Sequence, residues 1–87
     1  MADSSFADLK LELDDACAFL RGFTLGHRGF TLRDGLAGIQ RVSDLCDQLH
    51  KRFASGPHAG SAASAVASAR TRVAAAEARL ALLRRRK

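Results

Sequence analysis

The sequence predicts an all-α fold, a helical hairpin followed by a third, C-terminal helix in a coiled-coil-like three-helix arrangement. Along three separate segments, apolar residues recur at alternating spacings of three and four, which places them on one helix face. Residues that cap or stop helices stand between these segments. Trp and Tyr are absent and the apolar content is mostly Ala and Leu, which suits thin helical packing better than a β core. The 87 residues are enough for one small domain.

The first helix is expected at about residues 5–22. Its apolar face has 3-4-3-4-3 spacing and consists of Phe6, Leu9, Leu13, Ala16, Leu20 and Phe23. Ser5 is followed three residues later by Asp8, a pair that can cap the free backbone N–H groups of a first turn. The carboxylate of Asp8 also favours the positive end of the helix.

The second helix is expected at about residues 31–55. Its apolar face consists of Leu32, Ile39, Val42, Cys46, Leu49 and Phe53, with either Gly35 or Leu36 at the position between the first two. Thr31 and Asp34 repeat the capping pattern. Ser55-Gly56-Pro57 stops the helix, because proline cannot continue the hydrogen-bond ladder, and residues 55–59 form the linker.

The third helix is expected at about residues 60–85. Its apolar face has 4-3-4-3-4-3 spacing and consists of Ala62, Val66, Ala69, Val73, Ala76, Leu80 and Leu83. The side chains on this face are small near the start and large near the end, so we expect close backbone approach first and the main apolar contact later. Whether this helix folds back on the hairpin or extends away from it stays open at this stage.

The five residues Arg21-Gly22-Phe23-Thr24-Leu25 recur seven positions later as Arg28-Gly29-Phe30-Thr31-Leu32. A continuous helix through both copies would contain Gly22, Gly26, Gly29, Gly35 and Gly38. Each interior glycine costs about 1 kcal/mol relative to alanine. The two apolar faces are also out of phase by two residues. We therefore predict a glycine-rich joint at residues 22–30, with its apolar side chains folded back on the end of the hairpin.

Three sustained apolar faces with little bulk suggest that other chains complete the packing. The sequence therefore predicts a non-catalytic helical subunit or adaptor, which assembles a multi-protein complex through coiled-coil-type packing with helical partners or with copies of itself. The residues expected to pack against partner helices are Leu9, Leu13, Leu20, Ile39, Val42, Leu49, Phe53, Val66, Val73, Leu80 and Leu83.

The net charge of +5 is uneven along the chain: residues 1–30 carry −2, residues 31–56 carry +1 and residues 57–87 carry +6. This basic third can contact an acidic protein surface or nucleic acid. The candidate contact residues are Arg28, Arg70, Arg72, Arg79, Arg84, Arg85, Arg86 and Lys87. The alternative function is therefore a nucleic-acid-binding protein that uses the basic C-terminal helix.

The loop Gly26-His27-Arg28-Gly29 could assist such binding, because a GxxG turn clamps the nucleic-acid backbone in KH modules. A KH module also needs strands, and the sequence shows no convincing strand pattern beside the loop. Membrane binding is not expected, because the third helix carries mainly Ala and Val where interfacial helices carry Trp, Phe or several Leu.

No residue pattern predicts catalysis, a cofactor or a metal site. Cys46 and His50 share a helix face, but a closed zinc site needs four ligands. Cys17 and Cys46 are expected to be reduced thiols in the cytoplasm, with the nucleus as another possible location. If the hairpin turns near Gly26, Cys17 faces about residue 36, so Cys46 is about 15 Å away and too far for a disulfide.

Overall fold

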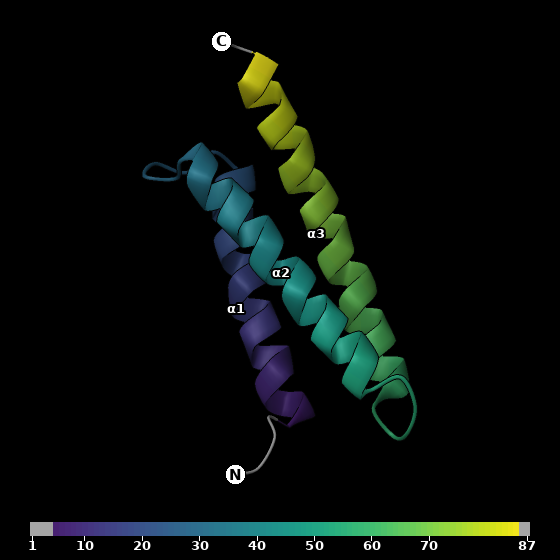
Figure 1. Cartoon of the computed structure of the whole chain (residues 1–87). Coiled ribbons are helices and arrows are strands. Elements are labelled where there is room, and N and C mark those ends of the chain that lie inside the picture. Colours follow the sequence, from purple (N-terminus) through teal and green to yellow (C-terminus); the bar gives the residue numbers. More distant parts are fainter. Residues whose placement is uncertain (1–4, 86–87) are drawn as a thin grey trace.

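The computed structural model describes residues 5–85, which form three α-helices, and it confirms the all-α prediction. The helices are α1 (Phe6–Thr24), α2 (Leu32–Arg52) and α3 (Ala59–Arg85). They pack together in an up-down-up order, so that α1 and α3 run in the same direction and α2 runs opposite to both (Figure 1). The third helix therefore folds back on the hairpin.

Both expected capping pairs form at the starts of α1 and α2. The Asp8 backbone N–H donates to Ser5 Oγ at 3.2 Å, and the Ser5 N–H donates to the Asp8 carboxylate at 3.4 Å. The corresponding distances for Thr31 and Asp34 are 3.2 Å and 2.8 Å. Each box satisfies N–H groups that have no partner inside the helix, which explains why both helices begin where the sequence predicts.

The end of α1 lies two residues beyond the predicted end, because Gly26 and not Gly22 closes the helix. The Gly26 N–H donates to the Phe23 carbonyl and the His27 N–H donates to the Gly22 carbonyl, both at 3.0 Å. This pair of bonds is a Schellman motif, which needs a left-handed residue, and Gly26 has φ +76°. The predicted joint of residues 22–30 is therefore corrected to residues 25–31.

Gly22 lies inside α1 and is covered by the loop that follows. The ring of Phe30 folds back over it, with Cζ 2.6 Å from the position that a Gly22 Cβ would occupy. Phe30 also contacts Phe19, with 5.0 Å between the ring centroids. A Cβ at this position would meet the ring, so Phe30 can approach this closely only because residue 22 is glycine.

The core lies between the three helices and consists of Leu9, Leu13, Ala16, Leu20, Phe23, Val42, Leu45, Cys46, Leu49, Ala65, Val66, Ala69, Ala76 and Leu80. At the loop end of the bundle, α2 approaches α1 through Gly35, where the Phe23 ring occupies the space of a Cβ. The structure thereby settles the open position on the second apolar face in favour of Gly35. Leu36 is instead 46% exposed.

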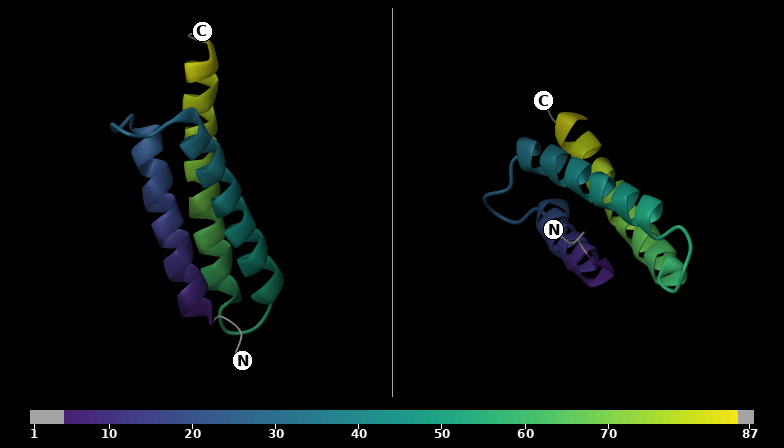
Figure 2. Two further views of the ribbon diagram at one scale, coloured as in Figure 1. Left: turned by 60° about the vertical axis from the view of Figure 1, so that its left-hand side comes forward. Right: turned by 60° about the horizontal axis from the view of Figure 1, so that its bottom comes forward.

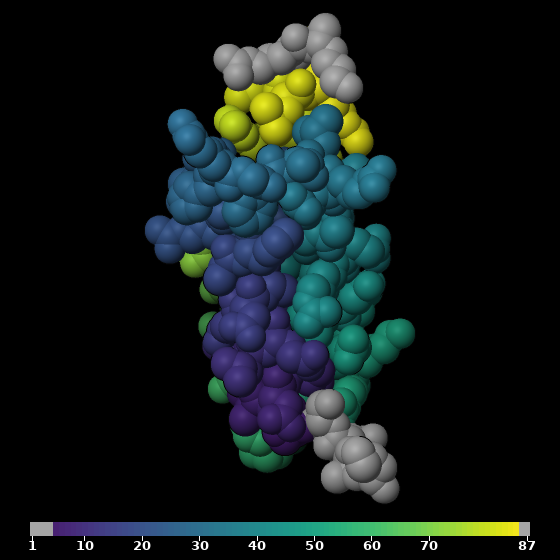
Figure 3. Space-filling model, turned by 90° about the vertical axis from the view of Figure 1, so that its left-hand side faces the viewer, coloured from purple at the N-terminus to yellow at the C-terminus, as the bar shows by residue number. Residues whose placement is uncertain are grey.

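Helix α2 ends at Arg52, with Phe53 as the C-cap, three residues before the predicted end. Helix α3 is the longest, with 27 residues against 19 in α1 and 21 in α2. Its C-terminal end consequently extends past the α1–α2 loop (Figure 2). In the space-filling view the yellow end of α3 rises above the blue loop, while α1 and α2 cover much of the rest of α3 on this side (Figure 3).

Candidate docking groove

The apolar residues that the sequence assigned to partner helices pack mainly against the chain's own helices. Seven of them are buried: Leu9, Leu13, Leu20, Val42, Leu49, Val66 and Leu80. The other four, Ile39, Phe53, Val73 and Leu83, are half-buried and pack against the same core. A partner of the folded bundle therefore needs a different contact surface.

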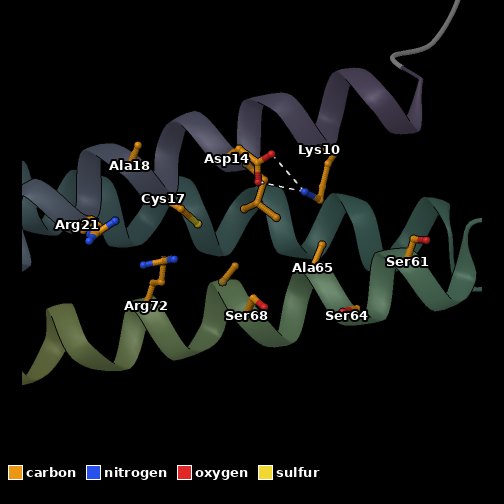
Figure 4. A pocket seen from close by; sticks show the side chains of 12 residues that line it. Lys10, Asp14, Cys17, Ala18, Arg21, Ser61, Ser64, Ala65, Ser68 and Arg72 are labelled. Atoms are coloured by element: carbon orange, nitrogen blue, oxygen red, sulfur yellow. Dashed lines mark hydrogen bonds and ion pairs between the residues drawn. The ribbon is translucent and has the colours of Figure 1, made fainter.

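Such a surface lies between α1 and α3, where the bundle is open along a groove of about 620 Å³ (Figure 4). From α1 the groove is lined by Lys10, Leu13, Asp14, Cys17, Ala18 and Arg21. From α3 it is lined by Ser61, Ser64, Ala65, Ser68, Ala69 and Arg72. All of these α3 residues except Arg72 have side chains of one or two heavy atoms, so α3 leaves unfilled space beside α1.

The position of the groove follows from serine spacing on α3. Ser61, Ser64 and Ser68 are separated by three and four residues, and Arg72 follows four residues later. Residues at these spacings share one side of a helix, and all four are exposed. Within residues 5–85, no hydrogen bond engages the three hydroxyl groups, so they remain able to donate to and accept from a bound molecule.

Charge divides the groove into two ends. At one end Lys10 Nζ contacts both carboxylate oxygens of Asp14 at 3.2 Å, an ion pair within α1. At the other end the groove is lined by Arg21 of α1 and by Arg72, which extends from α3 toward α1 (Figure 4). Neither arginine forms an ion pair with a carboxylate in the described part of the chain, so this end keeps two uncompensated positive charges.

Cys17 lies on the α1 wall of this groove and is half-buried. Burial raises the pKa of its thiol, against the opposing effect of the Arg72 charge. Burial likewise raises the pKa of Cys46, and Arg70 opposes that shift. Both cysteines are free thiols that stay protonated at neutral pH, which makes them poor nucleophiles.

The helix register places Cys17 differently from the sequence estimate. Because Phe23 meets Gly35 and Leu20 lies against Gly38, the residue opposite Cys17 is near position 41 and not 36. The estimate placed the turn at Gly26, but the chain between the helices extends to residue 31 and moves the register by several residues.

The basic residues of α3 point to different sides of the bundle. Arg72 enters the groove, whereas Arg70 lies on the α2 side beside Ser43 and Cys46. Arg79 reaches across the hairpin loop, with Nη2 2.9 Å from the position that a Gly26 Cβ would occupy. The Nε atom of Arg79 is buried without a hydrogen-bond partner.

The remaining candidate cations lie apart from the groove. Arg28 is exposed in the loop, and Arg84 and Arg85 are exposed on the last turn of α3. Arg86 and Lys87 lie outside the described residues. Of the predicted cations within residues 5–85, the structure brings only Arg72 into the groove. Lys10, Asp14, Arg21 and the three serines were not predicted from the sequence, although the spacing of the serines was a usable signal.

Other kinds of site receive no support from the described residues. Residues 5–85 contain no strand, so the strands that flank a GxxG loop in a KH module are missing from this part of the chain. In the same range, no three His, Cys, Asp or Glu side chains group together to hold a metal ion. None of the three described helices is long and apolar enough to cross a membrane.

Comparisons with known protein families, characterised proteins and solved structures found no match for this chain.

Proposed function

We propose that the chain is a non-catalytic helical adaptor, which assembles a protein complex by accepting a helix of a partner into the groove between α1 and α3. The groove is the observation that supports this function. It runs along two parallel helices, and a helix placed there would turn the three-helix bundle into a four-helix bundle.

The short side chains of the groove favour a helical occupant. Packed helices lie about 8–10 Å apart, and small residues at the contact allow the shorter distances. Ser64, Ala65 and Ser68 provide such a contact surface on α3, and Ala18 is a small lining residue on α1. The buried core meanwhile holds the three helices in place, so the groove is formed before a partner arrives.

The test is to fill the groove without touching the core. Ser68→Leu places a large side chain in the groove, and Ala74→Leu places the same side chain on an exposed part of α3 outside it. Tagged wild-type and variant chains would be recovered from their native cells, and the accompanying proteins identified by mass spectrometry. Circular dichroism would show that both variants remain helical.

We expect Ser68→Leu to lose protein partners that the wild type and Ala74→Leu retain. Equal recovery with both variants would contradict a docking groove. Recovery of nucleic acid without stable protein partners would support the alternative function, a nucleic-acid-binding protein.

A further inference from the structure

We infer that the occupant of the groove is a helix of a different protein with an acidic face, whose carboxylates pair with Arg21 and Arg72. This inference rests on the proposed function and adds the chemistry of the partner. Its starting point is the charge left over after the chain's own ion pairs have formed.

The groove contains three basic side chains and one carboxylate. Both carboxylate oxygens of Asp14 accept hydrogen bonds from Lys10, so Asp14 does not neutralise the arginines at the opposite end. Arg21 and Arg72 come from different helices and line the same end of the groove (Figure 4). Two guanidinium groups at one end of a groove repel each other, and a carboxylate placed between them would accept charge-assisted hydrogen bonds from both.

The remaining lining also suits a polar helix face. The hydroxyl groups of Ser61, Ser64 and Ser68 can exchange hydrogen bonds with polar side chains of an incoming helix. Alanines between them let its backbone approach closely. An occupant with small residues where it faces the serines and alanines, and with acidic residues beside Arg21 and Arg72, would satisfy both requirements.

A different protein fits these charges better than a second copy. The chain has a net charge of +5, so two copies repel each other. The acidic helix of the chain is α1, and it already forms one wall of the groove. Nucleic acid fits less well, because the groove presents two uncompensated cations and no aromatic side chain, whereas strand-binding grooves use series of cations and stacking.

The experiment uses two synthetic helical peptides with the same Ala and Leu positions, one carrying Glu and the other Lys at the flanking positions. Binding to the full chain would be measured by calorimetry at low and high salt. The groove variant is Arg21→Gln with Arg72→Gln. The matched control is Arg84→Gln with Arg85→Gln, which removes the same charge outside the groove.

We expect the Glu peptide to bind and the Lys peptide not to bind. The groove variant should weaken binding of the Glu peptide by at least about tenfold, because the charge-assisted hydrogen bonds from both guanidinium groups to the docked carboxylates are lost. The control should weaken it by less than about threefold, because exposed charges contribute little and are screened by salt.

Several outcomes would overturn the inference. Absence of Glu-peptide binding, equal binding of both peptides, or equal weakening by the two double variants would each do so.

If Ser68→Leu removes partners from cells while the arginine variant retains them, the docking function stands and the acidic partner is wrong. A dimer in sedimentation that dissociates in the arginine variant would identify a second copy as the occupant. Binding of a DNA or RNA oligonucleotide that is lost in the arginine variant, without binding of the Glu peptide, would replace the acidic helix with nucleic acid.

Discussion

The two copies of Arg-Gly-Phe-Thr-Leu have the same sequence and different structures. The first copy, residues 21–25, ends helix α1, and the second, residues 28–32, leaves the loop and starts helix α2. Gly22 is helical and buried, whereas Gly29 is exposed with φ +90°. The five-residue sequence therefore does not determine its own conformation. The conformation depends on where each copy lies relative to a helix cap and to a neighbouring helix.

The threonines of the two copies show the same contrast at a single side chain. Thr24 Oγ1 donates to the Leu20 carbonyl at 2.9 Å inside the helix that is ending. Thr31 Oγ accepts from the Asp34 N–H at 3.2 Å at the start of the next helix. The second threonine has Asp34 three residues later, and this carboxylate completes the capping box. The first has His27 at the corresponding position.

The largest expected difference between the copies is at phenylalanine. Phe23 is 2% exposed and fills the space beside Gly35, so Phe23→Ala should lower the free energy of unfolding by about 3–5 kcal/mol. Phe30 is half-buried, so Phe30→Ala should cost about 1–2 kcal/mol. Urea denaturation followed by circular dichroism measures both values. Equal losses would mean that the loop ring is as much part of the core as the helical one.

An intermediate difference between the copies is expected at glycine. The less crowded glycine, Gly29, should lose more stability on substitution by alanine than the more crowded Gly22. Gly29 has open space around the Cβ position but a left-handed φ, so Gly29→Ala should cost about 1–2 kcal/mol of backbone strain.

Gly22→Ala must displace the Phe30 ring, but an alanine gains about 1 kcal/mol of helix propensity, which offsets this cost. The thermal midpoint of Gly22→Ala should therefore stay closer to the wild type. A larger loss for Gly22→Ala than for Gly29→Ala would show that Phe30 cannot move aside.

The smallest effect is expected at threonine. Thr31→Ala removes a helix cap and should cost about 1 kcal/mol. Thr24→Ala removes one hydrogen bond to a carbonyl but places a better helix former in the last turn, so the change should be within about 0.5 kcal/mol. Denaturation midpoints of the two variants in one buffer provide the comparison. A Thr31→Ala midpoint equal to that of the wild type would contradict the importance of the cap.

Features that depend on a few neighbouring residues could be predicted from the sequence. Both capping boxes involve residues three positions apart, so Ser5 with Asp8 and Thr31 with Asp34 were recognisable. The apolar spacing similarly gave the helices and most of the core. The choice between Gly35 and Leu36 could not be made, because it depends on the Phe23 ring of another helix.

The candidate groove was less predictable than the fold. It exists because α3 folds back beside α1, which the sequence left open, and because small residues of α3 then lie opposite α1. Arg21 was not counted with the basic third, since it lies in the acidic part of the chain, and only packing brings it near Arg72. The long α1–α2 connection also changed which residue of α2 lies opposite Cys17.

Arg79 has a consequence for how the hairpin turn responds to α3. Its guanidinium lies against Gly26, although 53 positions separate the two residues in the sequence. The Gly26 and His27 N–H groups, which close α1 through the Phe23 and Gly22 carbonyls, therefore lie in a turn that a side chain of α3 contacts. We expect their exchange with deuterated water to follow the opening of α3 and not the fraying of α1 alone. The exchange rates of these two amides would then show whether α3, which forms one wall of the groove, is docked.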